Sequence, residues 1–321
     1  MTDHVAFDTL TYPSADGKST VHAYIWTPEH PRGIIQLSHG MCEYIQRYDA
    51  WARRFAAEGF VVAGNDHIGH GQTAPDKEAL GYTARRGGAD VIVEDLHSLT
   101  LLLRERFPAL PAVLYGHSMG SFAARLYLAR YGEELTAALI SGTAGPEAPT
   151  GIARLLARAI GKTKGYHHRS KLLTALAFGS YNRRFAGEGD SHSWLTRDAA
   201  VRGTYATDPF CHFIFTAAGY DTLFSLLGAV STKSHAAALP KDLPILVFAG
   251  EDDPVGNYGR GVREVHRRMV AAGCNATLKL YPAARHEMHN EHQRDEVFAD
   301  LLAYLDAIPA LQRKDTTANE S

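Results

Sequence analysis

The sequence predicts an α/β fold with a mostly parallel central sheet, helices on both of its faces and one helical insertion. Short apolar runs of strand length alternate with segments of helical period, and this alternation breaks only once. Strands buried on both faces by helices form parallel sheets. The chain has 321 residues, of which 45% are hydrophobic, and this is enough for a large core.

The predicted strands are nearly continuous in hydrophobicity, as parallel strands covered on both faces should be. They comprise residues 21–26, 33–38, 60–66, 112–117, 137–142, 244–250 and 276–282. Helices are predicted where apolar residues recur every three or four positions and so line one face. These sets are Tyr44, Tyr48, Trp51 and Phe55; Ile92, Leu96, Leu99 and Leu103; and Val297, Leu301, Tyr304 and Ile308.

The alternation breaks at 145–239, where helical patches occur at 152–160 and 171–178 without a convincing strand. Open α/β sheets bind ligands beyond the carboxyl ends of their strands, so we expect this insertion to lie there as a lid. The predicted organisation is a core in two parts, 1–144 and 240–312, a helical lid at 145–239 and a disordered polar tail at 313–321.

Charge and composition exclude several classes of protein. A formal net charge of −2 gives no reason to expect nucleic-acid binding. The three cysteines form no disulfide pattern, and no signal peptide is recognisable, so a cytoplasmic location is expected. The apolar stretch 210–230 contains His212, Asp221 and two glycines, which favours buried helices beside a pocket over a membrane span. The sequence does not predict an oligomeric state.

Residues 116–120 read Gly-His-Ser-Met-Gly and match the pattern G-x-S-x-G. They follow an apolar run and open a helix whose apolar face includes Phe122 and Leu126, the setting of a nucleophile elbow. The turn is so tight that the neighbours of Ser118 must be small if its hydroxyl is to stand clear. The alternative is an ordinary glycine-rich turn with Ser118 as a helix cap.

Acyl transfer also needs backbone N–H groups that face the oxygen of the tetrahedral intermediate. We expect one from Met119, directly after the nucleophile, and the other from Met41, because His39 and Gly40 end an earlier strand. Gly40, Tyr44 and His117, which lie close to these donors in the sequence, are expected to contact the substrate, and so is Phe213 of the insertion.

Longer stretches around these residues resemble the monoacylglycerol lipase and lysophospholipase group of serine hydrolases. The stretches are 38–73, 115–121, 195–211 and 248–256, and the similarity runs from about residue 12 to about residue 308. The resemblance implies an α/β-hydrolase fold, a helical lid and hydrolysis of fatty-acid monoesters of glycerol or phosphoglycerol. Two departures lie near the site: Ser121 replaces the usual glycine, and Cys42-Glu43-Tyr44 stands where the group often has Gly-Glu-His.

Three adjacent carboxylates, Glu251, Asp252 and Asp253, follow the strand at 244–250. In this fold the acid comes between the nucleophile and the histidine. The resemblance places it three residues after the glycine, on Asp253, and Pro254 favours the same residue because it holds its predecessor extended. Asp252 is the alternative.

The segment "YPAARHEMHNEH" (281–292) contains three histidines. A zinc-protease pattern needs histidines at i and i+4, but Asn290 occupies that position after His286. A strand and a loop precede His286, so we expect it to be the catalytic base, with His289 and His292 as neighbours on the next turn and helix. No metal or organic cofactor is expected, and His67 and His70 are expected to orient a loop beside the oxyanion turn.

The insertion is rich in aromatic residues, and about half of them are expected to line an acyl channel. They are Phe178, Trp194, Phe210, Phe213, Phe215, Tyr220 and Phe224. An exposed apolar edge of the lid would make transient contact with a membrane. Four basic residues of the insertion could bind a phosphate headgroup, and the alternative is that they form a solvated basic face. These are Arg169, Lys171, Arg183 and Arg184.

The sequence therefore predicts a serine hydrolase that cleaves carboxylic esters of fatty acids through an acyl-enzyme on Ser118. Monoacylglycerol and lysophospholipid are the expected substrates. A general carboxylesterase, thioesterase or peptidase with the same triad is the alternative among enzymes. A non-catalytic ligand receptor is disfavoured, because Ser118, Asp253 and His286 are all present.

Overall fold

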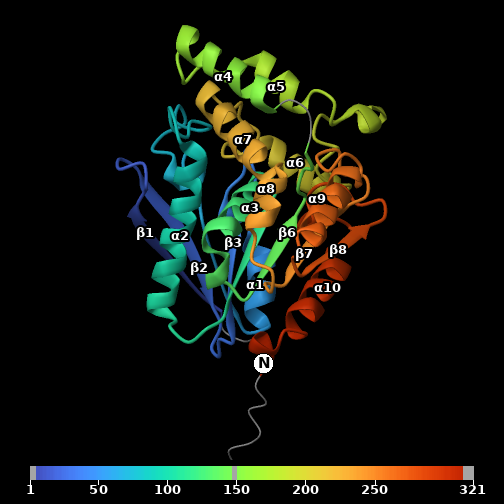
Figure 1. The fold of residues 1–321 in the computed structure, drawn as a ribbon. Helices are drawn as coiled ribbons and strands as arrows, with labels where there is room; N and C mark the ends of the chain where they lie inside the picture. The colour runs from blue at the N-terminus through green and yellow to red at the C-terminus, as the bar shows by residue number, and fades with distance from the viewer. Residues whose placement is uncertain (1–4, 147–149, 314–321) are drawn as a thin grey trace, which may run out of the picture.

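The computed structural model describes residues 5–146 and 150–313, so most of the predicted tail lies outside the described residues. Eight strands form one sheet. They are β1 (Ala6–Pro13), β2 (Thr20–Thr27), β3 (Gly33–Ser38), β4 (Phe60–Asn65), β5 (Ala112–His117), β6 (Ala137–Ser141), β7 (Ile245–Gly250) and β8 (Ala276–Tyr281). The order is β1-β2-β4-β3-β5-β6-β7-β8, and every neighbouring pair from β4 onward is parallel. The predicted mostly parallel sheet is confirmed (Figure 1).

The seven predicted strands match β2 to β8 to within one residue at each end. The sequence did not predict β1, which pairs antiparallel with β2 from Ala6 opposite Thr27 to Pro13 opposite Thr20. Most side chains of β1 are exposed because it forms the edge of the sheet. An edge strand of this kind lacks the continuous apolar run by which the other strands were recognised.

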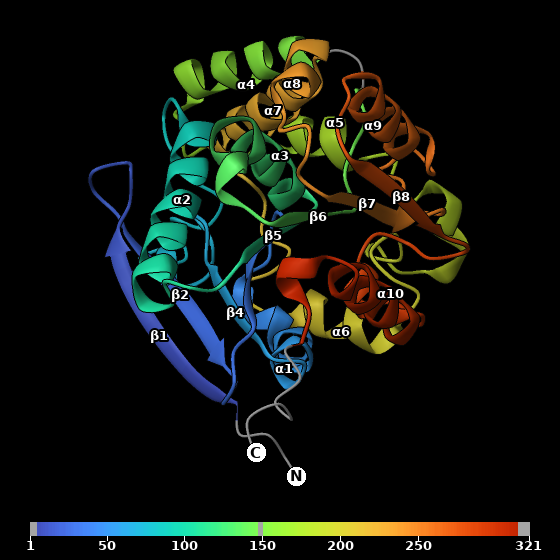
Figure 2. The ribbon, with the colours of Figure 1, turned by 60° about the horizontal axis from the view of Figure 1, so that its bottom comes forward.

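Helices cover both faces of the sheet, as predicted. Figure 2 shows α1 (Asp49–Ala57) and α10 (Arg294–Asp306) on one face, and α2 (Gly88–Arg106), α3 (Met119–Tyr131) and α9 (Arg260–Ala271) on the other. α1 starts later than its apolar pattern, because a 3₁₀ turn at Ile45–Tyr48 comes first and Tyr44 precedes that turn. Ile308 likewise lies beyond the end of α10.

The alternation of strand side chains assigns each residue to one of the two helix layers. Val113 and Tyr115 of β5 pack in one cluster with Phe55 of α1. Leu114, between them, packs in the opposite cluster with Leu96 of α2. The core therefore has two halves, one on each face of the sheet.

Between β6 and β7 the chain forms the predicted helical insertion. Its helices are α4 (Thr150–Lys164), α5 (Lys171–Phe178), α6 (Ala199–Thr207), α7 (Ala217–Val230) and α8 (Lys233–Ala238). In Figure 1, α4 and α5 form the outermost layer, beyond α7. None of the helices in the described chain is long and apolar enough to cross a membrane. The role of the insertion as a lid and its boundaries at 145 and 239 stay predictions.

One buried arginine of α3 links the segment that enters the insertion to the end of α7. Arg125 donates to the hydroxyl of Thr143 (3.2 Å) and the carbonyl of Ala144 (3.1 Å), where the chain leaves the sheet. It also donates to the carbonyl of Val230 (2.6 Å), where α7 ends. Burial lowers the pKa of Arg125 to about 9, so the side chain stays charged near neutral pH. Hydrogen bonds from a charged donor contribute about 1.5–3 kcal/mol each.

Candidate active site

The candidate site lies where the carboxyl ends of parallel strands meet. Ser118 follows β5, Asp253 and His286 lie in the loops after β7 and β8, and Met41 lies in the loop after β3. Parallel strands bring these ends to one edge of the sheet, so residues far apart in the sequence converge there.

Ser118 sits on a strained turn between β5 and α3. Its backbone has φ 54° and ψ −123°, which costs a residue with a side chain about 1–3 kcal/mol. Close packing explains the glycines: a Cβ atom on Gly120 would lie 2.0 Å from the Ser38 carbonyl oxygen, and one on Gly40 would lie 3.0 Å from Ser118 Cβ. The local geometry is that of a nucleophile elbow.

His286 and Asp253 form a buried pair. The Nδ1 atom of His286 lies 2.9 Å from Asp253 Oδ2, and Asp253 Oδ1 accepts from the backbone N–H of Val255 at 2.8 Å. Asp252, the alternative acid, is instead 44% exposed and lies 4.0 Å from Arg184. Because Nδ1 faces Asp253, Nε2 is the nitrogen left for Ser118. Within the described chain no hydrogen bond joins Ser118 to His286, but both line the same cavity.

The pKa values separate His286 from the other buried histidines. Seven histidines of the described chain are buried, and burial lowers the pKa of six of them. Burial also acts to lower the pKa of His286, but the charge and hydrogen bond of Asp253 outweigh it and raise the pKa above 6.5. A carboxylate thus favours the imidazolium that a catalytic base must form.

The expected oxyanion donors, Met41 and Met119, both line the cavity. Met119 is the first residue of α3, and the first N–H groups of a helix have no partner within it. No group among the described residues accepts from the Met41 N–H. The ring of His39 fixes this peptide: Nε2 accepts from the His67 N–H (2.9 Å), so Nδ1 donates to the Gly40 carbonyl (2.7 Å), which belongs to the same peptide unit as the Met41 N–H.

The remaining histidines pack against other residues. The His67 ring lies 4.2 Å from that of His39, and His70 lies 5.1 Å from it, which confirms the predicted packing beside the oxyanion turn. His289 is buried and stacks on Tyr48 at 4.3 Å. His292 is exposed and precedes α10, so its predicted place on a helix was wrong. Nowhere in residues 5–146 and 150–313 do His, Cys, Asp or Glu side chains form a group that could hold a metal ion.

A cavity of about 460 Å³ opens above Ser118. Of the predicted substrate-binding residues, Gly40, His117 and Phe213 line it. Tyr44 does not, because its hydroxyl points to Asp208 at 2.8 Å. Five of the seven insertion aromatics line the cavity, more than the half that was expected. They are Phe178, Trp194, Phe213, Tyr220 and Phe224.

Two carboxylates at the cavity wall share one arginine, a feature that the sequence analysis missed. Arg47 donates to Glu43 at 2.6 Å and to both oxygens of Glu287 at 2.9 and 3.0 Å. Burial acts to raise the pKa of Glu287, but the charge of Arg47 overrides it and lowers the pKa to about 2. The i,i+4 spacing of Glu43 and Arg47 hinted at a pair, whereas Glu287 could be placed only by the fold.

The basic residues considered for a phosphate headgroup do not line the cavity, and no lysine or arginine of the described chain does. The guanidinium of Arg169 donates to the carbonyls of Ile214 and Glu78. Arg184 stacks on the ring of Tyr258 at 3.4 Å. Lys171 lies on a shallow outer groove beside α5.

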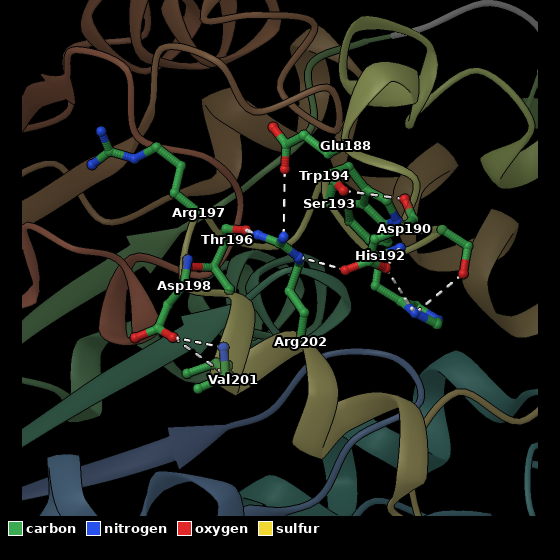
Figure 3. A network of polar contacts seen from close by, with 12 residues as sticks. Glu188, Asp190, His192, Ser193, Trp194, Thr196, Arg197, Asp198, Val201 and Arg202 are labelled. Atoms are coloured by element: carbon green, nitrogen blue, oxygen red, sulfur yellow. Dashed lines mark hydrogen bonds and ion pairs between the residues drawn. The ribbon is translucent and has the colours of Figure 1, made fainter.

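The segment that precedes α6 packs directly on the loop that carries His286. The ring of Trp194 lies 5.2 Å from that of His286, and the Glu287 N–H donates to the Leu195 carbonyl at 2.7 Å. Buried Arg202 holds this segment, because it donates to Asp190 (2.6 Å) and to the Thr196 carbonyl (2.8 Å) (Figure 3). This part of the insertion is therefore fixed to the core.

Residues 29–293 match the protein family described as Serine aminopeptidase, S33. The chain belongs to this family. A monoacylglycerol lipase of Mycolicibacterium smegmatis is 31% identical over 285 residues, which are 88% of this chain and 91% of that protein. The human monoglyceride lipase is 30% identical over 285 residues, which are 87% of this chain and 83% of that protein.

Among solved structures, a carboxyl esterase from Bacillus coagulans in complex with glycerol superimposes with a TM-score of 0.89 at 32% identity, over 95% of this chain and 99% of that chain. The family member described here is thus an α/β-hydrolase and a serine ester hydrolase. The predicted fold class and enzyme class are confirmed.

Proposed function

We propose that this hydrolase cleaves neutral fatty-acid monoesters of the monoacylglycerol type. In the first step Ser118 Oγ attacks the ester carbonyl while Nε2 of His286 takes its proton, and Asp253 stabilises the imidazolium. The N–H groups of Met41 and Met119 bind the oxyanion. His286 then protonates the leaving glycerol, and water releases the fatty acid from the acyl-enzyme by the same steps.

The charge of the cavity wall is the observation that favours a neutral substrate. Its lining is mostly apolar and, within the described chain, includes no lysine or arginine. The carboxylates that do line it, Glu43 and Glu287, are bound by Arg47. The lining offers a phosphodiester no cation of its own, because Arg47 lies behind the two carboxylates and its charge is already shared by them, which disfavours a lysophospholipid. A glycerol monoester is neutral and meets no such penalty, and relatives named as monoacylglycerol lipases support this choice.

The description of the family as aminopeptidases raises the peptidase alternative. An aminopeptidase must bind the free ammonium group of its substrate, and a carboxylate with spare acceptor capacity is the natural partner. Glu43 also accepts from the Gly40 N–H and the Tyr48 hydroxyl, and Glu287 accepts from Asn290. Because these bonds and Arg47 occupy both carboxylates, the ester reaction is favoured.

The proposal includes a cytoplasmic location and transient contact with a membrane. The three cysteines are free, in keeping with the reducing cytoplasm. Leu155 of α4 and Leu172 of α5 are 67% and 59% exposed on the outermost layer of the molecule. Ile152 and Leu176, which are also exposed, line the cavity, so the apolar surface continues to its mouth. Transient membrane contact there would let a lipid enter from the bilayer.

Replacing the nucleophile tests the proposal. Ser118→Ala should lower kcat on 1-monoacylglycerol by at least about 10⁴-fold, because the acyl-enzyme cannot form, and should leave the circular dichroism spectrum unchanged. Ser98→Ala is the matched control, since Ser98 only donates to the Glu94 carbonyl on α2. Wild-type protein should release fatty acid from monoacylglycerol at least about tenfold faster than from lysophosphatidylcholine. Activity retained by Ser118→Ala, or a faster reaction with the phospholipid, would contradict the proposal.

A further inference from the structure

The loop that carries the Met41 N–H is bonded to the insertion through two side chains. We define this oxyanion loop as residues 40–44. Its Tyr44 hydroxyl donates to Asp208 Oδ2 at 2.8 Å, and the Cys42 thiol donates to the Phe213 carbonyl at 3.0 Å. Both contacts reach one short segment of the insertion, residues 208–213.

From this geometry we infer that Tyr44 and Asp208 are positioning residues, which couple the place of the insertion to the direction of the Met41 N–H. The inference rests on the proposed function, in which that N–H binds the oxyanion. Neither side chain lines the cavity, so their effect on the reaction would be transmitted through the loop.

The insertion side of this link is well anchored. Asp208 is the C-terminal cap of α6, and its carbonyl accepts from the Cys211 N–H at 3.0 Å. Its other carboxylate oxygen accepts from the Phe210 N–H at 2.8 Å. At the opposite end of α6, Asp198 caps the helix and Arg202 holds the preceding segment, as Figure 3 shows. The short helix α6 is therefore fixed at both of its ends, and the Asp208 carboxylate that accepts from Tyr44 lies at the C-terminal end.

The loop side is under strain beside the donor. Cys42, the residue directly after Met41, has φ 56°, in the left-handed region that favours glycine. Burial raises the pKa of the Cys42 thiol well above its usual value, so the thiol stays protonated and can donate to Phe213. The ring of Tyr44 packs on Phe210 at 5.6 Å. A backbone in this conformation keeps its shape only when its surroundings hold it.

The core holds the same loop from the opposite side. Within the loop the Gly40 N–H donates to Glu43, whose carboxylate accepts from Arg47 and Tyr48. The Ile45 N–H, directly after the loop, donates to Asp66 at 2.9 Å. The Met41 peptide thus lies between contacts to the core and contacts to residues 208–213. Since Phe213 also lines the cavity, a substrate that moves this segment would move the oxyanion donor as well.

Tyr44→Phe tests the link, because it keeps the ring and removes the hydroxyl. A trifluoromethyl ketone forms a tetrahedral adduct with Ser118 and needs the oxyanion donors, whereas a 1-O-alkylglycerol ether fills the cavity without reacting. We expect kcat and trifluoromethyl ketone affinity to fall together by about tenfold, since small displacements of a preorganised group have effects of this order. Ether affinity should change less than about twofold.

Three further variants sharpen the test. Tyr131→Phe is the matched control, since its hydroxyl donates to Glu94 at 2.7 Å far along α3, and it should behave as wild type. Cys42→Ala removes the second bond and should lower kcat, whereas Cys42→Ser keeps a donor and should restore it. A Tyr44→Phe/Asp208→Asn double variant should lose no more than Tyr44→Phe alone.

The inference is wrong if Tyr44→Phe stays within about twofold of wild type, or if ether affinity falls as much as trifluoromethyl ketone affinity. The second result would mean a deformed cavity instead of a displaced donor. A wild-type protein that forms no adduct and hydrolyses no ester would overturn the proposed function itself. The two failures are therefore distinguishable.

Discussion

At the scale of single residues, the contact between Asp253 and His286 determines the expected pH dependence. In the proposed mechanism the general base must be neutral to accept the Ser118 proton, so activity should fall as the pH drops through the pKa of His286. Asp253 raises that pKa above 6.5. We therefore expect the acidic limb of kcat/KM to have its midpoint above pH 6.5, which a profile from pH 5 to 9 measures.

The variant Asp253→Asn should move this limb to lower pH and lower kcat by about 10⁴-fold, because the imidazolium loses its partner. Asp252→Asn is the control: Asp252 is partly exposed and should leave both the limb and kcat near wild type. A larger loss in Asp252→Asn than in Asp253→Asn would show that the wrong carboxylate has been assigned.

The site residues that can be predicted from the sequence are those that lie within a local pattern. Ser118 lies in a five-residue motif between a strand and a helix, and His286 follows a strand and a loop. Whether Asp252 or Asp253 meets His286 depends on the direction of two adjacent side chains, and only the folded loop fixes it. The role of Tyr44 depends on Asp208, which is 164 positions away, so no local pattern could reveal that contact.

At the scale of elements, α4 shows why an exposed face is hard to read from sequence. Its apolar residues form one broad stripe, and periodicity alone does not say which part of that stripe is buried. In the structure the small residues Ala153, Ala157 and Gly161 are buried, and Asp221 of α7 pairs with Arg158. The larger Leu155 is left in solvent.

This arrangement predicts how the insertion meets lipid. Leu155→Ser/Leu172→Ser should reduce co-sedimentation with phospholipid vesicles by about tenfold or more, because each leucine that enters the bilayer contributes roughly 1–2 kcal/mol. Hydrolysis of vesicle-bound monoacylglycerol should fall in parallel. Hydrolysis of monomeric p-nitrophenyl butyrate should not change, because neither residue lines the cavity.

The matched control is Leu101→Ser, which removes an equally apolar side chain, 50% exposed, from α2 on the body of the molecule. It should bind vesicles as the wild type does. Equal losses in Leu101→Ser and in the insertion variant would mean that binding is unspecific and that α4 and α5 have no special part in it.

At the scale of the whole molecule, the number of buried histidines could not be predicted from the composition. The sequence contains 17 histidines, but only the fold decides which are enclosed. Six are buried with lowered pKa values, among them His67 and His289 at about 3 and His70 at about 4. They stay neutral in the folded protein at a pH where exposed histidines in the unfolded chain become charged.

This difference predicts that acid destabilises the fold well above the pKa of most carboxylates. At pH 5.5 a histidine with a pKa of 6.5 is protonated in the unfolded chain, whereas the same residue stays neutral when it is buried in the folded protein. This difference favours unfolding by about 1.4 kcal/mol per residue. Asp66 and Asp95, whose pKa values burial raises to about 6, oppose this, because they gain protons in the folded state. Each offsets less than about 1 kcal/mol at that pH, and His286 and Glu43, whose pKa values are also raised in the folded protein, oppose the loss as well.

Six histidines outweigh these groups, so the free energy of unfolding in urea should fall by several kcal/mol (of order 5) between pH 7.5 and pH 5.5. Most of the loss should appear between pH 6.5 and about pH 4, where the unfolded chain binds more protons than the folded one. His235→Leu removes one buried histidine of α8, away from the cavity, and should reduce the pH dependence by about 1.4 kcal/mol. An unfolding free energy that is equal or higher at pH 5.5 would mean that these histidines are charged or solvated in the native state, and the same experiment would then place the assigned ring contacts in doubt.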